Sequence, residues 1–232
     1  MPYYYWGGDS KLLWITLIMM IIPLYASMKV QNTFQLYSKK RTLAGYTGEE
    51  VARRILAINN INIPIQPVRG SMTDFYDPIN KALALSQTVY GVDSIAAVGV
   101  AAHECGHAIQ DARDYAFLRF RHSIYPLTNF ASRLSMPLIF LGLVFSTMSF
   151  LVDFGIILFA ITTLFAIVTL PVEFNASKRA LATLESSGIL TSEELVGAKK
   201  VLDAAALTYV AAAMASILSL VRLIMISNRR DD

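Results

Sequence analysis

The stretch His103-Glu104-Cys105-Gly106-His107 offers the clearest chemistry in this sequence, because it reads H-E-x-x-H. It contains two of only three histidines in 232 residues. Side chains four residues apart lie on the same face of a helix, so both imidazoles can bind one metal ion. Glu104 would lie beside a water molecule bound to that metal. Two neutral histidine ligands and a nearby carboxylate are typical of a zinc hydrolase.

The residues around this motif predict the helix that would position it. Residues 96–102 are all Ala, Val or Gly, and residues 108–110 follow without a proline. Asp93 or Ser94 would cap the first turn of a buried helix. Cys105 would point away from the histidine face, so we expect a small buried side chain there. It is the only cysteine, which excludes an intrachain disulfide.

A catalytic zinc ion needs three protein ligands and one open position, so the motif leaves one ligand to be found. His122 is the remaining histidine, but Arg119 and Arg121 beside it favour an exposed basic segment. Glu173 is the better candidate. It follows Pro171 at the end of an apolar run, where an acidic residue can also be an ordinary surface charge.

The segment after Pro171 predicts a new helix that could bring Glu173 to the metal-binding helix. Asn175, Ala176 and Ser177 are small, and small side chains allow helices to pack closely. Ser177 lies one turn beyond Glu173 on the same face. Its hydroxyl could hydrogen-bond a ligand imidazole and hold it in place.

The H-E-x-x-H stretch together with Glu173-Phe174-Asn175-Ala176-Ser177 resembles the gluzincin arrangement of membrane metallopeptidases. The sequence is most similar to the neutral zinc metallopeptidase family of bacterial membrane proteins. Residues 72–78, 85–86 and 98–104 also carry this likeness, which covers nearly the whole chain. The resemblance implies a Zn²⁺ cofactor bound by His103, His107 and Glu173, with Glu104 as the general base.

Two positions depart from related proteins. The heat-shock-linked and prenyl-protein-processing membrane proteases, which are more remotely similar, carry Asp where this chain has Ser177. A hydroxyl orients an imidazole less strongly than a carboxylate does. Phe75 stands where the closer family often has His, so no role of that His transfers to this chain.

The expected mechanism requires Glu104 to accept a proton from the activated water and pass it to the leaving amine. A second donor to the developing oxyanion is usual, and Tyr90, Tyr115 and Arg179 are candidates among which the sequence does not choose. Residues 82–85 could form an edge strand that pairs with an extended protein or peptide substrate. Ordinary core packing is the alternative for that segment.

The composition indicates a membrane protein. The chain is 55% hydrophobic and only 16% charged, whereas about a quarter of the residues in soluble domains are charged. The net charge of +3 is not gathered into a basic run, which argues against a nucleic-acid partner. The lipid bilayer is therefore the expected partner besides the substrate. The sequence does not indicate an oligomeric state.

Four apolar runs, residues 12–26, 136–152, 156–172 and 204–226, predict four transmembrane helices. Tyr3-Tyr4-Tyr5-Trp6 before the first run suggests an aromatic belt at the membrane interface. A cleaved signal peptide is the alternative for the first run, and the scarcity of cations before it argues against that reading. Asp153-Phe154-Gly155 is the predicted turn of a hairpin between the second and third runs.

The cations predict the orientation, because Lys and Arg concentrate in cytoplasmic loops. Lys29, Lys39, Lys40 and Arg41 follow the first run, against Lys11 alone before it. We therefore expect a multi-pass protein of the bacterial plasma membrane with a cytoplasmic catalytic domain. The orientation of the fourth run is ambiguous, since lysines precede it and arginines follow it.

The predicted fold is a mainly α membrane protein with a small α+β gluzincin-like catalytic domain between the first and second spans. The expected divisions are an anchor (1–28), the metallopeptidase domain (29–133), the hairpin (134–172), a third-ligand and cytoplasmic segment (173–203) and a last span (204–232). Within the metallopeptidase domain, Thr47 and Glu50 would cap a helix to Ile58. An edge strand is expected within residues 61–68, a loop over 70–78 and an extended segment over 82–86.

The function that this pattern favours is a membrane-embedded zinc metallopeptidase. A membrane scaffold that retains a structural zinc is one alternative, but a structural site has no need of Glu104. An intramembrane-cleaving protease is another. The apolar stretch before His103 is too short for a span, and the polar residues 110–114 follow almost at once.

Overall fold

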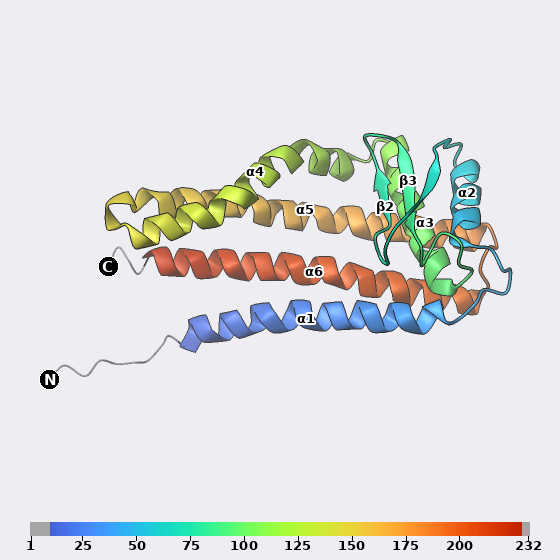
Figure 1. Cartoon of the computed structure of the whole chain (residues 1–232), viewed down its shortest axis with the longest axis horizontal. Coiled ribbons are helices and arrows are strands. Elements are labelled where there is room, and N and C mark those ends of the chain that lie inside the picture. The colour runs from blue at the N-terminus through green and yellow to red at the C-terminus, as the bar shows by residue number, and fades with distance from the viewer. Residues whose placement is uncertain (1–9, 229–232) are drawn as a thin grey trace. The chain divides into compact units, whose positions relative to one another are not determined.

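The computed structural model describes residues 10–228 and is mainly helical, as predicted (Figure 1). In chain order the elements are α1 (Ser10–Ser38), α2 (Gly48–Ile58), β1 (Ile65–Val68), β2 (Phe75–Asp77), β3 (Ala82–Ser86), α3 (Ile95–Ala112), α4 (Ala116–Val144), the short 3₁₀ helix η1 (Ser146–Met148), α5 (Phe150–Ser186) and α6 (Ser192–Asn228). The predicted aromatic belt at residues 3–6 lies outside the described residues.

The chain divides into two compact units. Among the described residues, one unit contains residues 28–120 with 169–208, and the other contains residues 10–27, 121–168 and 209–228. The predicted divisions at 133/134, 172/173 and 203/204 each fall inside a continuous helix. The placement of a gluzincin-like domain between the first two spans stays a prediction.

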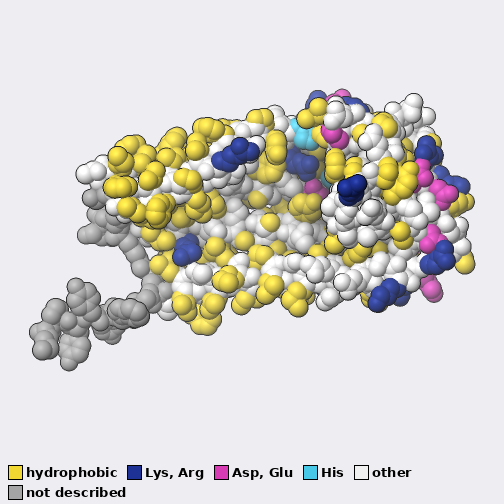
Figure 2. Space-filling view, in the orientation of Figure 1, with side chains coloured by type: hydrophobic (Ala, Val, Ile, Leu, Met, Phe, Trp, Pro, Cys, Tyr) yellow, Lys and Arg dark blue, Asp and Glu magenta, His cyan; other side chains and the backbone are white. Residues whose placement is uncertain are grey.

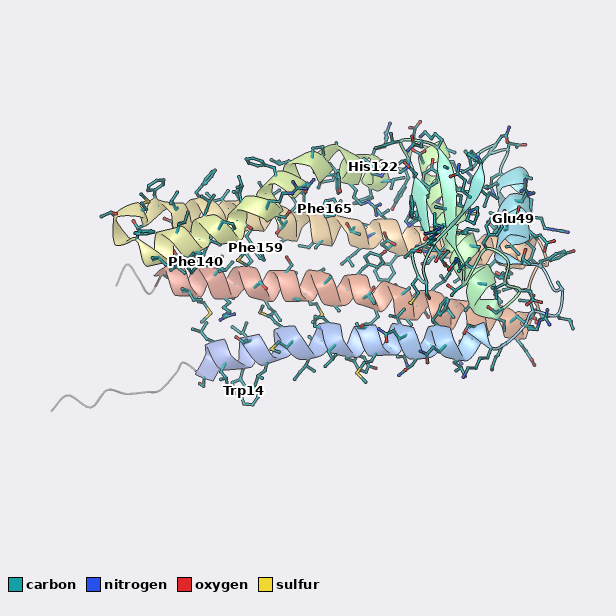
Figure 3. The ribbon with its side chains drawn as sticks, in the orientation of Figure 1. Trp14, Glu49, His122, Phe140, Phe159 and Phe165 are labelled. Atoms are coloured by element: carbon teal, nitrogen blue, oxygen red, sulfur yellow. The ribbon has the colours of Figure 1, made fainter. Side chains whose placement is uncertain are left out.

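Within residues 10–228, four helices are long and apolar enough to cross a membrane, which matches the predicted number of spans. They are Leu12–Ser38 of α1, α4, α5 and α6. Trp14 and Phe140, labelled in Figure 3, are 62% and 66% exposed, as expected of side chains that face lipid. Figure 2 shows hydrophobic side chains over much of these helices and charged ones around α2 and the sheet.

The turn of the helical hairpin was predicted wrongly. It lies at residues 145–149, around η1, and Asp153-Phe154-Gly155 belongs to the first turns of α5. Asp153 accepts a hydrogen bond from Ser227 Oγ of α6 at 3.0 Å. A Cβ on Gly155 would lie 2.8 Å from the carbonyl oxygen of Ser135, so the glycine permits α4 and α5 to approach. Both residues therefore serve helix packing and not a turn.

Pro171 does not start a new helix, contrary to the prediction. It lies inside α5, which continues to Ser186. Apolar helices tolerate proline because neighbouring groups can satisfy the freed carbonyl. Helix α5 ends just before Ser187 and Gly188, and Gly188 takes the left-handed conformation with φ +63°. At the start of α6, the Thr191 hydroxyl accepts a hydrogen bond from the backbone N–H of Glu194. The Glu194 carboxylate accepts one from the backbone N–H of Thr191.

Capping residues set the limits of the two shorter helices as predicted. Thr47 accepts a hydrogen bond from the backbone N–H of Glu50, whose carboxylate accepts one from the backbone N–H of Thr47 in return. Helix α2 ends at Ile58, as the sequence indicated. Ser94 caps α3 through the backbone N–H of Ala97 at 3.2 Å. The helix that carries the H-E-x-x-H motif therefore begins where the sequence predicted.

The three strands form one sheet in the order β1-β3-β2, with β1 parallel and β2 antiparallel to β3. Strand β1 is an edge strand, as predicted. Strand β3 is the central one, with Leu83 and Leu85 fully buried, so the expectation that residues 82–85 offer a free edge was wrong. Strand β2 was missed because Gly70, Asp74 and Pro78 around it are typical of a loop.

Helix α3 lies at the centre of the core of the first unit. The buried side chains of its cluster come mainly from α1, α2, β3, α3, α5 and α6, and they include Val51, Ile55, Leu83, Val98 and Ala101. Gly99 packs against Ala198, where an added Cβ would make ordinary van der Waals contact. This packing holds the motif helix from several sides at once.

Candidate metal centre

Three metal-ligating side chains converge from α3 and α5. His103 and His107 lie one turn apart on α3, and Glu173 comes from α5. The Nε2 atoms of His103 and His107 are 3.3 and 3.6 Å from Oε2 of Glu173. One ligand atom from each residue lies within 4.8 Å of the others. This is the one such cluster found in the described part of the chain.

Close helix packing brings Glu173 to the motif helix. A Cβ on Gly106 would lie 2.5 Å from the carbonyl oxygen of Ala176, so only a glycine fits at this contact. Ala176 and Ala180 of α5 are fully buried. The expectation that small residues after Glu173 allow the approach is consistent with this geometry, although they belong to α5 and not to a new helix.

The second nitrogen of each imidazole has a side-chain partner. His103 Nδ1 is 3.1 Å from Ser177 Oγ, the contact that the sequence suggested. His107 Nδ1 is 3.0 Å from Gln110 Oε1. The amide of Gln110 donates through Nε2 to the carbonyl oxygen of Val172 at 2.8 Å, so Oε1 must face His107. His107 therefore carries its proton on Nδ1 and directs the lone pair of Nε2 toward Glu173.

Gln110 was missed at the sequence level. It is fully buried, and its amide also bonds Asn175 Oδ1 at 3.0 Å. The signal was present, because a long polar side chain three residues after a ligand histidine stands in an otherwise apolar helix. A buried amide needs several partners, and here all of them come from the metal helix or from α5.

The donor set fits a zinc ion. Two imidazole nitrogens and one carboxylate oxygen leave the fourth tetrahedral position for water or substrate. Hydrogen bonds with Ser177 and Gln110 orient the two rings, as the partners of metal-binding histidines usually do. His103, His107 and Glu173 would hold the ion.

Glu104 is buried beside these residues, with 9% of its surface exposed. The backbone N–H of Tyr76, in β2, lies near its carboxylate and favours its charged form. Burial is the main reason that the pKa of Glu104 is raised to about 7. The charge of His103 lowers this pKa, whereas the charges of Glu173 and Asp74 raise it further. The carboxyl group can thus take up and release a proton near neutrality.

Side-chain contacts hold β2 against α3, and they bring the backbone of Tyr76 close to Glu104. The Tyr76 hydroxyl donates to Asp111 Oδ2 at 2.5 Å, and Lys81 forms an ion pair with the same carboxylate. Asp74, just before the strand, accepts hydrogen bonds from the backbone N–H and the hydroxyl of Ser86. Burial raises the pKa of Asp74, while the bonds from Ser86 lower it.

The three predicted oxyanion donors lie in different surroundings. Arg179 donates to Asn175 Oδ1 at 2.7 Å, and its guanidinium lies 5.9 Å from the ring centre of Tyr115. Asn175 links this pair to Gln110. Tyr90 packs against the core, and its carbonyl accepts a hydrogen bond from the first turn of α2.

Neither Cys105 nor His122 joins the ligand cluster among the described residues. Cys105 is buried on the opposite side, with Sγ 3.7 Å from the carbonyl oxygen of Ala52 in α2. His122 lies on α4 (Figure 3), and the described cluster of metal-ligating groups does not include it.

Comparisons with known proteins agree with this geometry. Residues 12–228 match a family described as "Putative neutral zinc metallopeptidase". The chain is 46% identical over 222 residues to "Putative membrane protease YugP" of Bacillus subtilis (strain 168). The match covers 95% of this chain and 98% of that protein. No matching solved structure was found.

Proposed function

This chain belongs to the zinc metallopeptidase family whose description it matches over residues 12–228, and from that membership we propose that it hydrolyses peptide bonds at the centre formed by His103, His107 and Glu173. The observation that carries the proposal is the convergence of these three side chains beside the buried carboxylate of Glu104. The resemblance seen in the sequence had led to the same family.

Zinc held by these ligands would lower the pKa of a bound water to about 7 and polarise the substrate carbonyl. Glu104 accepts the proton of that water and later delivers it to the leaving amine. The backbone N–H of Tyr76, near the carboxylate, favours its charged form before the proton is taken up. Gln110 keeps His107 in the tautomer that ligation requires, and Ser177 orients the ring of His103.

Arg179 and Tyr115 are the better candidates for the oxyanion donor. They approach each other, and Arg179 connects through Asn175 to Gln110 beside His107. Tyr90 is weaker, because its described contacts lie with the core and α2. Substrate pairing, if it uses a strand, would use the outer edge of β2 in place of β3, since β2 adjoins Glu104.

The two alternative functions fit the structure less well. A scaffold with a structural zinc would have no use for a carboxylate buried beside the ligands, where burial disfavours its charge. An intramembrane-cleaving protease would carry the motif in a span, but α3 is not among the four candidate spans of the described residues.

The four apolar helices and the similarity to a membrane protease indicate a membrane protein. We extend this to a multi-pass protein of the bacterial plasma membrane whose metal centre faces the cytoplasm. The support is the excess of Lys and Arg after the first apolar run (residues 12–26), in residues 29–41, over Lys11 alone before that run.

The direct test measures zinc content and proteolysis of the purified full chain with an unfolded, casein-like protein as substrate. Glu104→Gln should keep about one zinc per chain and lose at least about 10²-fold in rate, the lower bound for a missing general base. Glu173→Ala should lose zinc. Chelation should abolish cleavage, and added zinc should restore it.

Glu193→Gln is the matched control, because that glutamate is exposed in the first turn of α6. It should behave like the wild type in both measurements. Full zinc occupancy in Glu173→Ala would remove Glu173 from the ligand set. Undiminished cleavage by Glu104→Gln would refute the proposed base.

A further inference from the structure

A groove of about 470 Å³ lies between α1 and α6, within the unit that contains the metal centre. Lys29, Thr33 and Tyr37 line it from α1, at spacings of four residues. Lys200, Ala204 and Leu207 line it from α6, at spacings of four and three. These spacings place one continuous face of each helix in the groove. The two helices run in opposite directions (Figure 1).

The groove is positively charged. The side chains of Lys29 and Lys200 are exposed, and neither has an ion pair with another residue in the described part of the chain. Asp203 also lines the groove, but its carboxylate bonds the amine of Lys199 at 2.6 Å. The acidic group is thereby neutralised, and the two remaining lysines give the groove its charge.

The groove lies where both helices leave their apolar runs. The run in α1 ends at residue 26, three residues before Lys29, and the run in α6 begins at Ala204. The floor is closed by Tyr37 and Ala204, which are 8% and 4% exposed. Lysine and tyrosine at the end of a span are typical of the membrane–water interface.

We propose that this groove binds the phosphate headgroup of an anionic phospholipid such as phosphatidylglycerol. The phosphate would lie between the amines of Lys29 and Lys200, with the acyl chains along the apolar residues of α1 and α6. Basic pockets between transmembrane helices recognise lipid headgroups in this way. The inference does not depend on the peptidase proposal, because none of these residues belongs to the metal centre.

The test titrates the purified full chain, in a neutral detergent, with phosphatidylglycerol and in parallel with phosphatidylcholine. Bound lipid is counted by native mass spectrometry. Wild type should bind one phosphatidylglycerol more tightly than phosphatidylcholine. The double variant Lys29→Gln/Lys200→Gln should weaken the binding of phosphatidylglycerol by about 25-fold, at about fivefold per lysine. Thr33→Phe keeps both charges but fills the groove, and it should also weaken binding.

Lys39→Gln/Lys178→Gln is the matched control, since it removes the same charge from exposed lysines that do not line the groove. It should bind like the wild type. Equal affinity of the groove variant and this control would overturn the proposal, as would equal binding of the two lipids. Tight binding of glycerol 3-phosphate without acyl chains would identify a soluble phosphate site and contradict a lipid site.

Discussion

Gln110 shows how a single residue can connect the two halves of the metal centre. Its amide oxygen accepts from His107, and its amide nitrogen donates to Val172 and Asn175 of α5. The same side chain thus sets the tautomer of one ligand and contacts the helix that carries Glu173. Replacing it should disturb zinc binding without touching any ligand.

Gln110→Leu should therefore lower zinc affinity by roughly 10- to 100-fold, the usual cost of removing a partner that orients a ligand. Gln110→Glu keeps an acceptor for His107 and should retain more of the affinity. Competition with a chromophoric chelator measures both. Wild-type affinity in Gln110→Leu would show that His107 needs no such support.

Sequence reasoning found most residues of the site but not all of their supports. The spacing of His103 and His107 predicts a shared metal, and the structure places Glu173 and Ser177 beside them. Gln110 was not predicted, because a glutamine does not by its residue type indicate a role in a metal site. Its importance comes from where α5 passes, and long-range packing of that kind has no local pattern in a sequence.

At the scale of elements, Gly106 controls the distance between α3 and α5. Gly106→Ala would place a Cβ 2.5 Å from the carbonyl oxygen of Ala176, and the helices would have to separate. The expected result is a loss of about 1–3 kcal/mol in the free energy of unfolding, together with weaker zinc binding. Denaturant unfolding of the apo and zinc-loaded protein measures both effects.

Gly99→Ala is the control on the same helix, because its added Cβ would lie 3.5 Å from the Cβ of Ala198, an ordinary contact. That variant should remain close to the wild type in stability. A similar loss in both variants would mean that α3 tolerates no alanine at either glycine, irrespective of the contact with α5.

The elements that the sequence predicted well carry local signals. Thr47 and Ser94 mark the starts of α2 and α3 through hydrogen bonds to backbone N–H groups three residues further along the chain. The errors came from residues whose partners are distant. Asp153 suggested a turn, yet it bonds Ser227 of another helix. Strand β2 is short and becomes a strand through pairing with β3.

At the scale of the whole molecule, the distribution of cations predicts which segments face the cytoplasm. Single cysteines introduced into a Cys105→Ala background can test this in intact bacteria with a membrane-impermeant thiol reagent. Ser149→Cys, in the turn between α4 and α5, should be labelled from outside. Ser187→Cys, after α5, should be labelled only once the cells are opened.

This difference follows from a cytoplasmic metal centre, because α5 would cross the membrane between the two positions. The native thiol is fully buried, so Cys105→Ala removes little surface chemistry. Labelling of Ser187→Cys and not of Ser149→Cys in intact cells would reverse the proposed orientation and leave the chemistry of the site unaffected.

The origin of Glu173 on α5 has a consequence for biosynthesis. The ribosome completes α2, the three strands and α3, with both histidines, long before it reaches residue 173. Until the helical hairpin has been translated and inserted, a nascent chain would hold at most two of the three ligands. On the proposed function, cleavage would start only after the third span has entered the bilayer, which would protect the emerging chain and its neighbours during translation.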